Sequence, residues 1–370
     1  MKSRGQPGSR RTGNRVGLKQ LANHLGLSQS AVSFVLNDAP QAKTLSEETR
    51  RRVLEAAKQF NYRPSYFARM LGRGRTDSIG LIVPELSEGY FTLVMGGIEQ
   101  YLLKTDYLYF ISCHYWQPAL MQEYPQLLMD RGAEGLLLLN TNVDFETHLP
   151  VVAVSGHRAR AGATNLTLDH ARSAHLAIEH LVSLGHREIA FMKGQPFSLD
   201  SDYRWNAILQ AAHDYGIIVR PELTIMLTSN SWSPELGYEP VKRLLAKTRD
   251  FTAIFCFNDT SAIGAISAII EEGLRVPDDI SVIGFDDIMT AAYQNPALTT
   301  IRQPLYEMGQ KGAAMLLDKI ENPQKEFPTE IVFNPELIVR KSTRAITPLE
   351  QKSAPRKRLK PRAEKTPVEA

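Results

Sequence analysis

Residues 26–37, GLSQSAVSFVLN, carry no charged side chain and place three serines among apolar residues. Apolar side chains recur at helical spacing, and Ser28 is a candidate N-cap for a short helix. Its predicted inner face consists of Ala31, Val32, Val35 and Leu36. Short hydrogen-bonding side chains and Phe34 remain for the outer face, whereas arginines and lysines lie on both sides of the stretch. The stretch therefore predicts a short helix whose outer face approaches another molecule closely.

Two further helices flank this stretch. An apolar face precedes it, and Gly26 can terminate that helix; the face holds Leu18, Leu21, Ala22 and Leu25. A third helix opens at Ser46, with Glu47 and Glu48 in the first turn, where the helix dipole favours acidic residues. Its predicted apolar stripe is Val53, Leu54, Ala57 and Phe60. Three short helices, the first two joined by a tight turn, predict an all-α helix-turn-helix DNA-binding domain at residues 16–63.

Charge is segregated along the chain. Residues 1–76 hold 15 Lys/Arg and 4 Asp/Glu, a net charge of +11, and residues 346–370 carry +4. The remaining residues, 77–345, carry −12. This distribution predicts a head that binds a polyanion, joined to a body that does not. We expect a basic disordered arm at 1–15, a linker at 64–76 and a basic disordered tail at 346–370.

The body alternates strand-like and helical segments. Continuous Val/Ile/Leu runs that alternate with amphipathic helices are typical of doubly wound α/β domains with parallel sheets. The length of this region predicts two similar lobes within residues 77–345. The strand-like runs are 78–85, 107–115, 134–140, 151–156, 187–194, 252–259 and 279–287. The helical runs are 92–104, 170–185, 204–216, 238–248 and 260–273.

The composition indicates the cellular compartment of the protein. The two cysteines, Cys113 and Cys256, lie in separate apolar runs, which predicts buried thiols in a reducing compartment. The basic N-terminus has no apolar stretch behind it, so we expect no signal peptide. The longest apolar runs are far shorter than the roughly 20 residues that span a bilayer. The sequence therefore predicts a cytoplasmic protein without a membrane partner.

The outer face of the second helix suggests how DNA is read. Gln29 can pair with adenine, Ser30 and Ser33 can bond bases or phosphates, and Phe34 can cover a thymine methyl. The flanking cations are suited to phosphates; they are Arg10, Arg11, Arg15, Lys19, Arg50, Arg51 and Arg52. The alternative is a small helical bundle that docks on another protein.

Four long motifs make a resemblance specific. They cover residues 16–38, 46–85, 181–194 and 273–304, the last reading GLRVPDDISVIGFDDIMTAAYQNPALTTIRQP. In these motifs the chain resembles the LacI/GalR family of bacterial transcriptional regulators over about residues 16–344. The resemblance implies a homodimeric repressor that binds a palindromic double-stranded DNA operator. It also implies a hinge helix at 64–76 and a two-lobed, periplasmic-binding-protein-like sensor. The expected lobes are about 77–171 with 303–331, and about 172–302 with 332–345.

The resemblance assigns DNA contacts by position. Gln29 and Ser30 match readers of the major groove, and Phe34 stands where the family often has arginine, which leaves the operator sequence there in doubt. Leu71 matches a hinge leucine that inserts into the minor groove; without the resemblance, packing of Leu71 against its own domain is the favoured interpretation. The expected DNA-binding set is Lys19, Ser28, Gln29, Ser30, Ser33, Phe34, Asn37, Arg69, Leu71 and Arg73.

Ligand candidates follow the predicted strands, because two α/β lobes hold a ligand at the carboxyl ends of their strands. Asn258 and Asp259 follow one strand, and Asp286 and Asp287 follow another; we expect Asp287 to cap a helix rather than bind ligand. The expected ligand-binding set, completed by the resemblance and by departures from it, is Tyr90, Ser155, Arg204, Trp232, Asn258, Asp286 and Gln303. A sugar or sugar derivative is the leading small-molecule effector, with purines and sugar phosphates as alternatives.

Three other classes of function compete with this one. A metalloenzyme is suggested by His170, His175, His180 and His186, but their spacing of five, five and six residues does not align ligands on a helix. No nucleophile elbow, P-loop or HExxH motif occurs, so we expect no enzyme, no metal and no cofactor. A sugar-transport protein is disfavoured by the helical head. Nonspecific, nucleoid-type DNA binding remains open.

Overall fold

The computed structural model describes residues 16–37, 39–62, 75–87, 89–142, 145–156, 162–228 and 233–347. These residues fall into two compact units that divide between Thr76 and Asp77. The expected arm, hinge helix and tail lie outside the described residues, apart from residues 75–76 and 346–347.

The first unit is a small bundle of α1 (Leu18–Leu25), α2 (Gln29–Leu36), the 3-10 helix η1 (Pro40–Thr44) and α3 (Glu47–Gln59). Gly26 ends α1 in the left-handed conformation, with φ 66°, and the Ser46 side chain caps α3, as the sequence predicts. The predicted stripe of α3 is wrong at Leu54, whose side chain is exposed. Ala56 is buried instead, because residues 53, 56, 57 and 60 share one helix face.

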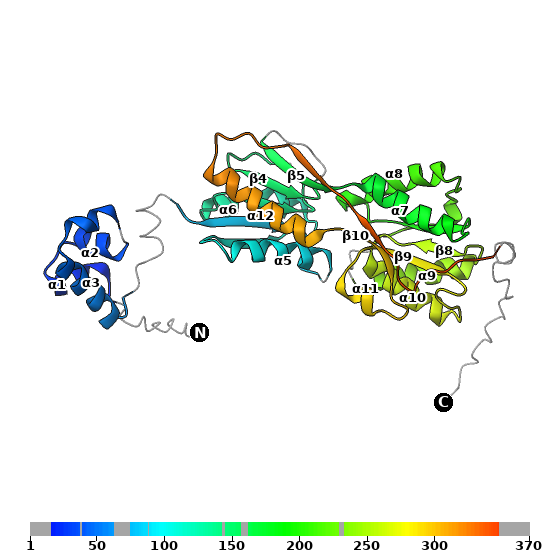
Figure 1. Cartoon of the computed structure of the whole chain (residues 1–370), viewed down its shortest axis with the longest axis horizontal. Coiled ribbons are helices and arrows are strands. Elements are labelled where there is room, and N and C mark those ends of the chain that lie inside the picture. The colour runs from blue at the N-terminus through cyan, green and yellow to red at the C-terminus, as the bar shows by residue number, and fades with distance from the viewer. Residues whose placement is uncertain are drawn as a thin grey trace, which may run out of the picture. The chain divides into compact units, whose positions relative to one another are not determined.

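The second unit contains two six-stranded sheets, each flanked by helices (Figure 1). The first sheet has the order β11-β5-β4-β3-β1-β2, and all its neighbouring strands are parallel. Its strands are β1 (Ser78–Val83), β2 (Leu108–Cys113), β3 (Leu136–Leu139), β4 (Val151–Val154), β5 (Ala163–Leu168) and β11 (Glu330–Phe333). Its helices are α5 (Tyr90–Leu102), α6 (Pro118–Asp130) and α12 (Leu305–Glu321). We call this part lobe 1.

The second sheet forms lobe 2 and has the order β12-β10-β9-β8-β6-β7, with only the β10–β12 pair antiparallel. Its strands are β6 (Ile189–Lys193), β7 (Thr224–Met226), β8 (Ala253–Phe255), β9 (Ser281–Asp286), β10 (Thr299–Arg302) and β12 (Glu336–Ile338). Its helices are α7 (His170–Ser183), α8 (Leu199–Asp214), η2 (Pro221–Leu223), α9 (Glu235–Lys247), α10 (Asp259–Glu271) and α11 (Met289–Tyr293). The fold is thus a helical head followed by a two-lobed doubly wound α/β unit.

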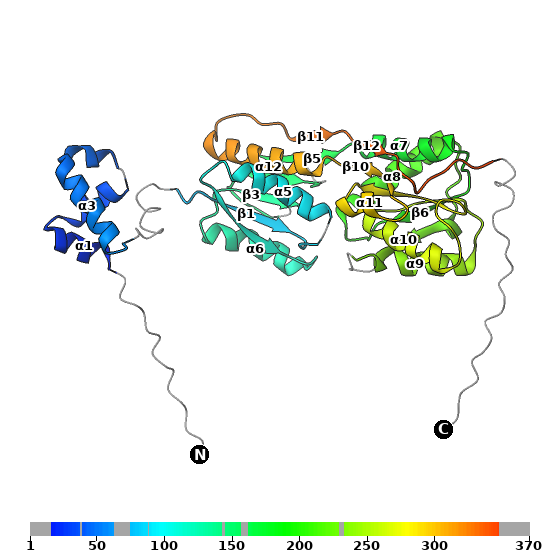
Figure 2. The ribbon, with the colours of Figure 1, turned by 60° about the horizontal axis from the view of Figure 1, so that its bottom comes forward.

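Both faces of each sheet are buried at its central strands, which explains the near-continuous apolar runs there. In β1, Ile79 and Leu81 pack with α5 and α12, whereas Ile82 packs with Leu128 of α6 on the other face. Figure 2 shows α12 and α6 on opposite sides of the lobe 1 sheet. Lobe 2 repeats the plan, with α9 and α10 on one face and α7 and α8 on the other.

The chain crosses between the lobes three times: from β5 to α7, from β10 to α12 and from β11 to β12. These crossings place the carboxyl ends of both sets of parallel strands at the boundary between the lobes. Among the described residues, no helix is both long enough and apolar enough to span a membrane.

Candidate functional site

The first candidate surface is the outer face of α2 in the head. Ser28 Oγ accepts a hydrogen bond from the Ala31 backbone N–H at 3.1 Å, so the predicted N-cap is confirmed. Gln29 and Ser30, the first residues of the capped helix, are exposed, and Lys19 is exposed on α1. Val32 and Val35 are buried behind them. The head therefore presents two short polar side chains at a helix N-terminus, the position from which a recognition helix reads bases.

Other predicted DNA contacts have partners within the head. Asn37 Nδ2 donates to the Ser33 carbonyl at 2.9 Å and to Ser33 Oγ at 3.1 Å, so these two side chains close the C-terminal end of α2. Phe34 is half-buried against the core of the head, which leaves less of its ring for a base than its position in the sequence suggests. Arg69, Leu71 and Arg73 lie outside the described residues.

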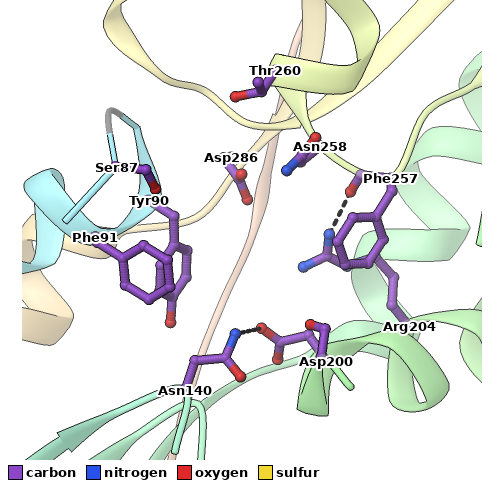
Figure 3. Close-up of a pocket in the computed structure, with 11 residues that line it drawn as sticks. Ser87, Tyr90, Phe91, Asn140, Asp200, Arg204, Phe257, Asn258, Thr260 and Asp286 are labelled. Atoms are coloured by element: carbon purple, nitrogen blue, oxygen red, sulfur yellow. Dashed lines mark hydrogen bonds between the residues drawn. The ribbon is translucent and has the colours of Figure 1, made fainter. Parts of the chain in front are cut away.

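The second candidate site is a cavity between the lobes of the α/β unit, at the ends of their strands (Figure 3). Lobe 1 contributes α5 and the residue after β3, and lobe 2 contributes α8, the residues after β8 and the last residue of β9. The lining residues are Ser87, Tyr90, Phe91, Asn140, Ser198, Asp200, Arg204, Phe257, Asn258, Thr260 and Asp286. Four of the seven predicted ligand-binding residues are therefore in this lining.

Arg204 of α8 is the cation of the cavity and is 4% exposed. Its guanidinium carbon lies 3.6 Å from the Phe285 ring centroid and 4.5 Å from that of Phe257. Its Nη1 donates to the Phe257 carbonyl at 2.5 Å (Figure 3). Burial lowers the pKa of Arg204, and the carboxylates of Asp200 and Asp286 act in the opposite direction. A planar, fixed guanidinium is suited to gripping polar ligand groups.

Asp286, the last residue of β9, faces Arg204 across the cavity. Gln303 Nε2 donates to its Oδ1 at 2.6 Å, so Gln303 orients the carboxyl group rather than lining the cavity. Burial raises the pKa of Asp286 to about 7, although Arg204 and Gln303 act to lower it. Its φ of 115° is a backbone conformation that a residue with a side chain rarely adopts. This strained strand end directs the carboxyl group into the cavity.

Tyr90 and Asn258 complete the predicted lining. The Tyr90 hydroxyl donates to Ser155 Oγ at 2.7 Å, so Ser155 acts by holding Tyr90. Asn258 Oδ1 caps α10 by accepting from the Ser261 N–H, which leaves the amide nitrogen of Asn258 to meet a ligand. Trp232 lies outside the described residues.

The sequence did not predict several polar residues of the cavity, among them Asn140 and Asp200. Asn140 directly follows β3, and Asp200 lies in the first turn of α8. Asn140 Nδ2 donates to Asp200 Oδ2 at 3.4 Å, which joins the two lobes (Figure 3). Asn140 obeys the same strand-end rule that identified Asn258, so the rule could have found it. Asp200 follows a loop after β6 and carried no comparable signal.

Two other acidic strand-end residues are structural. Asp259 is fully buried, accepts from Thr300 Oγ1 at 2.6 Å and from the Ile288 N–H at 2.9 Å, and burial raises its pKa. The prediction that Asp287 caps a helix is wrong, because α11 begins after Ile288 and has no side-chain cap. Asp287 instead pairs with Arg302 at 2.7 Å and Arg340 at 2.6 Å.

The four spaced histidines have four separate partners. His170 lies 3.5 Å from Asp200, and His175 lies 3.1 Å from Asp214. His180 and His186 bond to Thr343 and Thr252 respectively. Within the described ranges, no group of three or more His, Cys, Asp or Glu side chains could hold a metal ion.

Taken together, the cavity offers carboxylate and amide acceptors, amide donors and one fixed guanidinium on two lobes. This donor and acceptor set can bind a small polar molecule and bring the lobes together around it. A helix-turn-helix head joined to such a two-lobed unit defines the class of ligand-responsive DNA-binding regulators.

Comparisons with known proteins assign the family. Residues 17–65 match "Bacterial regulatory proteins, lacI family", and residues 178–343 match "Periplasmic binding protein-like domain". The HTH-type transcriptional repressor PurR of Actinobacillus pleuropneumoniae serotype 3 is 32% identical over 335 residues, which cover 88% of this chain and 98% of the relative. PurR of Erwinia tasmaniensis is 33% identical over 334 residues, covering 88% of this chain and 96% of that protein.

Solved structures agree with the sequence relatives. The lac repressor dimer bound to operator and the anti-inducer ONPF matches with a TM-score of 0.77 and 25% identity, covering 90% of this chain and all of that one. A LacI family regulator from Enterococcus faecium with bound ribose matches with a TM-score of 0.64 and 28% identity, covering 73% of this chain and 100% of that chain. This chain belongs to the LacI family, and it is a DNA-binding transcriptional regulator of that family. The predicted family and fold class are confirmed.

Proposed function

We propose that this protein is a homodimeric repressor that binds a palindromic operator and whose operator affinity is set by a small effector bound between its lobes. The observation that carries the DNA-binding part is the Ser28-capped helix, which exposes Gln29 and Ser30 on a segment with a net charge of +11. The proposed DNA-binding set also includes Lys19, Ser33, Phe34, Asn37, Arg69, Leu71 and Arg73. The site of action is the cytoplasm.

A sugar or sugar derivative is the effector that the cavity chemistry favours. Asp200 and Asp286 can accept hydrogen bonds from paired hydroxyls, and Arg204 and the amides of Asn140 and Asn258 can donate to ring or hydroxyl oxygens. Two carboxyl groups beside one guanidinium disfavour a phosphorylated ligand, because like charges would meet in a buried site. The solved relative from Enterococcus faecium contains ribose.

A purine base is the second candidate. Tyr90, Phe91 and Phe257 bring aromatic rings to the same cavity, and a flat heterocycle could lie against them while its N–H groups donate to a carboxylate. Relatives named PurR are 32% identical to this chain over most of its length. The two candidate effectors differ in chemistry: the first is a ring rich in hydroxyl groups, and the second is a planar ring.

Exposed apolar side chains support the proposed homodimer. In lobe 1, Leu103 and Leu108 are 75% and 69% exposed; in lobe 2, Met289 and Tyr293 are 73% and 85% exposed. Burial of such side chains against a second copy of the chain would remove apolar surface from water. The lac repressor structure that this chain resembles is a dimer on its operator.

The DNA-binding proposal is tested with the full-length protein in a mobility-shift assay, on selected binding sites and on random duplex as competitor. Several phosphate contacts should lower operator affinity at least roughly tenfold between about 50 and 200 mM salt. Binding that random duplex removes as easily as the unlabelled site would instead indicate nonspecific DNA binding. Salt-independent affinity would contradict the proposal.

The effector is tested by thermal shift with a panel of neutral sugars, sugar phosphates and purine bases. A compound that raises the melting temperature and changes operator affinity is the expected effector. Stabilisation only by sugar phosphates would contradict the charge argument. Stabilisation only by purines would select the second candidate.

A further inference from the structure

A strained turn follows β2 at the edge of the cavity. Tyr115 and Trp116 both adopt positive φ values, 48° and 59°, where bulky residues are rarely found and which cost free energy. The turn is fixed by backbone hydrogen bonds: the Tyr115 N–H donates to the Pro84 carbonyl at 2.8 Å, and the Gln117 N–H donates to the His114 carbonyl at 2.8 Å. Two consecutive left-handed residues turn the indole away from the sheet of its own lobe.

The His114 side chain holds this turn in place. It is fully buried, and Nε2 is 2.9 Å from Thr141 Oγ1 beyond the end of β3. Its Nδ1 accepts the Trp116 backbone N–H at 3.1 Å. Burial lowers the pKa of His114 to about 4, so the ring is neutral and Nδ1 remains an acceptor. The imidazole also meets the indole edge to face, with ring centroids 5.6 Å apart.

The Trp116 indole contacts the other lobe. Its centroid lies 4.9 Å from that of Phe197, which is in the turn between β6 and α8. Phe197 directly precedes Ser198 in the cavity lining, and the hydrogen bond between Asn140 and Asp200 joins the lobes nearby. Trp116 and Phe197 are both half-buried. The two side chains therefore form an aromatic contact between lobes beside the ligand cavity.

A second contact between the lobes lies at the start of α5. A Cβ atom on Gly89 would lie 3.1 Å from Ile288 Cγ2, and Leu93 packs against the cores of both lobes. The cavity lined by Tyr90, Arg204 and Asp286 has a volume of about 30 Å³, room for a few water molecules. Ligand pockets usually measure roughly 300–1,000 Å³. A sugar or base therefore enters only when the lobes separate, and contacts between lobes must break for that to happen.

We propose that Trp116 and Phe197 form an aromatic clasp that sets the balance between open and closed lobes and thereby sets effector affinity. The clasp rests on the proposed function only for its effect on the effector; the contact itself does not depend on any ligand. The strained turn carries the indole that makes this contact. Trp116 and Phe197 are positioning residues, since neither belongs to the cavity lining.

The first test uses intrinsic fluorescence without a ligand. The chain has three tryptophans, so the Trp205→Phe/Trp232→Phe variant leaves Trp116 as the only emitter. In this background, Phe197→Ala should shift the emission to longer wavelength and raise the acrylamide quenching constant roughly twofold. Ile218→Ala, a change at an exposed residue beyond the far end of α8, is the matched control and should change neither. Unchanged emission and quenching in Phe197→Ala would overturn the clasp.

The second test measures affinity by calorimetry with ribose and with adenine as probes. Trp116→Ala and Phe197→Ala should each weaken binding of the probe by two- to tenfold, the range expected for loss of one aromatic pair. The double variant should do no more than the larger single change, and Trp116→Phe should restore most of the affinity. Additive losses, or no change in any variant, would overturn the role in effector binding. If the parent protein binds neither probe, the proposed effector classes fail, and the fluorescence result alone decides the clasp.

Discussion

Replacing Asp286 by asparagine should stabilise the protein at alkaline pH, although Asp286 belongs to the ligand cavity. The side chain is buried, and burial raises its pKa to about 7, compared with about 3.9 in an unfolded chain. A raised carboxyl pKa means that the folded protein binds the proton more tightly than the unfolded chain. This stabilisation is complete below about pH 4 and is lost as the pH rises through 7.

The size of the effect follows from these two pKa values. Asp286 ionises between pH 5 and pH 8, which lowers the free energy of unfolding of the parent protein by about 2–3 kcal/mol. The variant has no carboxyl group at this position and does not show this loss. Asparagine is nearly isosteric, and its Oδ1 can still accept from Gln303 Nε2. The pKa of about 7 already includes the attraction to Arg204. We expect the free energy of unfolding of Asp286→Asn, relative to that of the parent, to rise by at least about 1 kcal/mol from pH 5 to pH 8.

Urea unfolding at fixed protein concentration, at pH 5 and pH 8, measures this difference. Asp287→Asn is the matched control, because Asp287 pairs with Arg302 and Arg340 and its loss should destabilise the protein at both pH values. An equal effect of Asp286→Asn at the two pH values would refute the reasoning. In operator-binding titrations, the same variant should lose its response to the effector, while basal operator affinity stays within about threefold, or ~0.7 kcal/mol.

Two further predictions concern the hinge and the packing of lobe 1. Leu71→Ala should weaken specific operator binding by on the order of a few kcal/mol and reduce DNA bending, with nonspecific affinity unchanged in a competition assay; equal bending and affinity would mean that Leu71 is only packed. Gly97→Ala should destabilise the protein by roughly 1–3 kcal/mol, because the new Cβ would lie 2.0 Å from the Tyr306 carbonyl oxygen. Gly96→Ala, whose Cβ would lie 3.7 Å from the Tyr306 ring, should be neutral in the same unfolding assay.

The sequence predicted the strands that are apolar on both faces and missed those that are not. β1, β2, β3, β4, β6, β8 and β9 are short, largely apolar runs, and each lies where the pattern predicts. β5, with the sequence ATNLTL, is fully buried but contains three polar residues, so its pattern resembles a loop. Thr164 and Thr167 satisfy their hydroxyls through Pro328 and Glu330, partners more than 160 residues away that no local pattern reveals.

α12 was missed for a related reason. Gly309 and Gly312 interrupt its apolar face, and glycine inside a helix disfavours that structure. The structure explains Gly309, because a Cβ there would lie 2.1 Å from the Val94 carbonyl oxygen of α5. On the other side of this crossing, Gly97 of α5 lies equally close to the backbone of α12. The benefit of a glycine at a close helix crossing depends on the other helix, more than 200 residues distant in the chain.

The candidate ligand site was partly predictable because strand ends converge in a parallel α/β fold. Asn258 and Asp286 follow from that rule, Arg204 came from the family resemblance, and Tyr90 came from a departure from the family pattern. The roles were less predictable than the positions. Ser155 and Gln303 orient Tyr90 and Asp286, because their side chains are already engaged in hydrogen bonds at 2.7 and 2.6 Å. Side-chain pairing across strands is a tertiary property, so sequence spacing does not distinguish a ligand contact from its support.

The arrangement of the site limits how an effector could act on DNA. The lobes are joined by three chain crossings, and Arg302 at one crossing pairs with both Asp287 and Glu336 of lobe 2. A ligand held between Tyr90 of lobe 1 and Asp286 of lobe 2 would therefore change the angle between the lobes rather than any single bond. The expected hinge helix at 64–76, of which only residues 75–76 are described, would be marginal alone in water at that length. If closure moves two such segments together or apart in a dimer, the effector changes operator affinity without touching DNA. The coupling is reciprocal, so the operator must change effector affinity by the same factor.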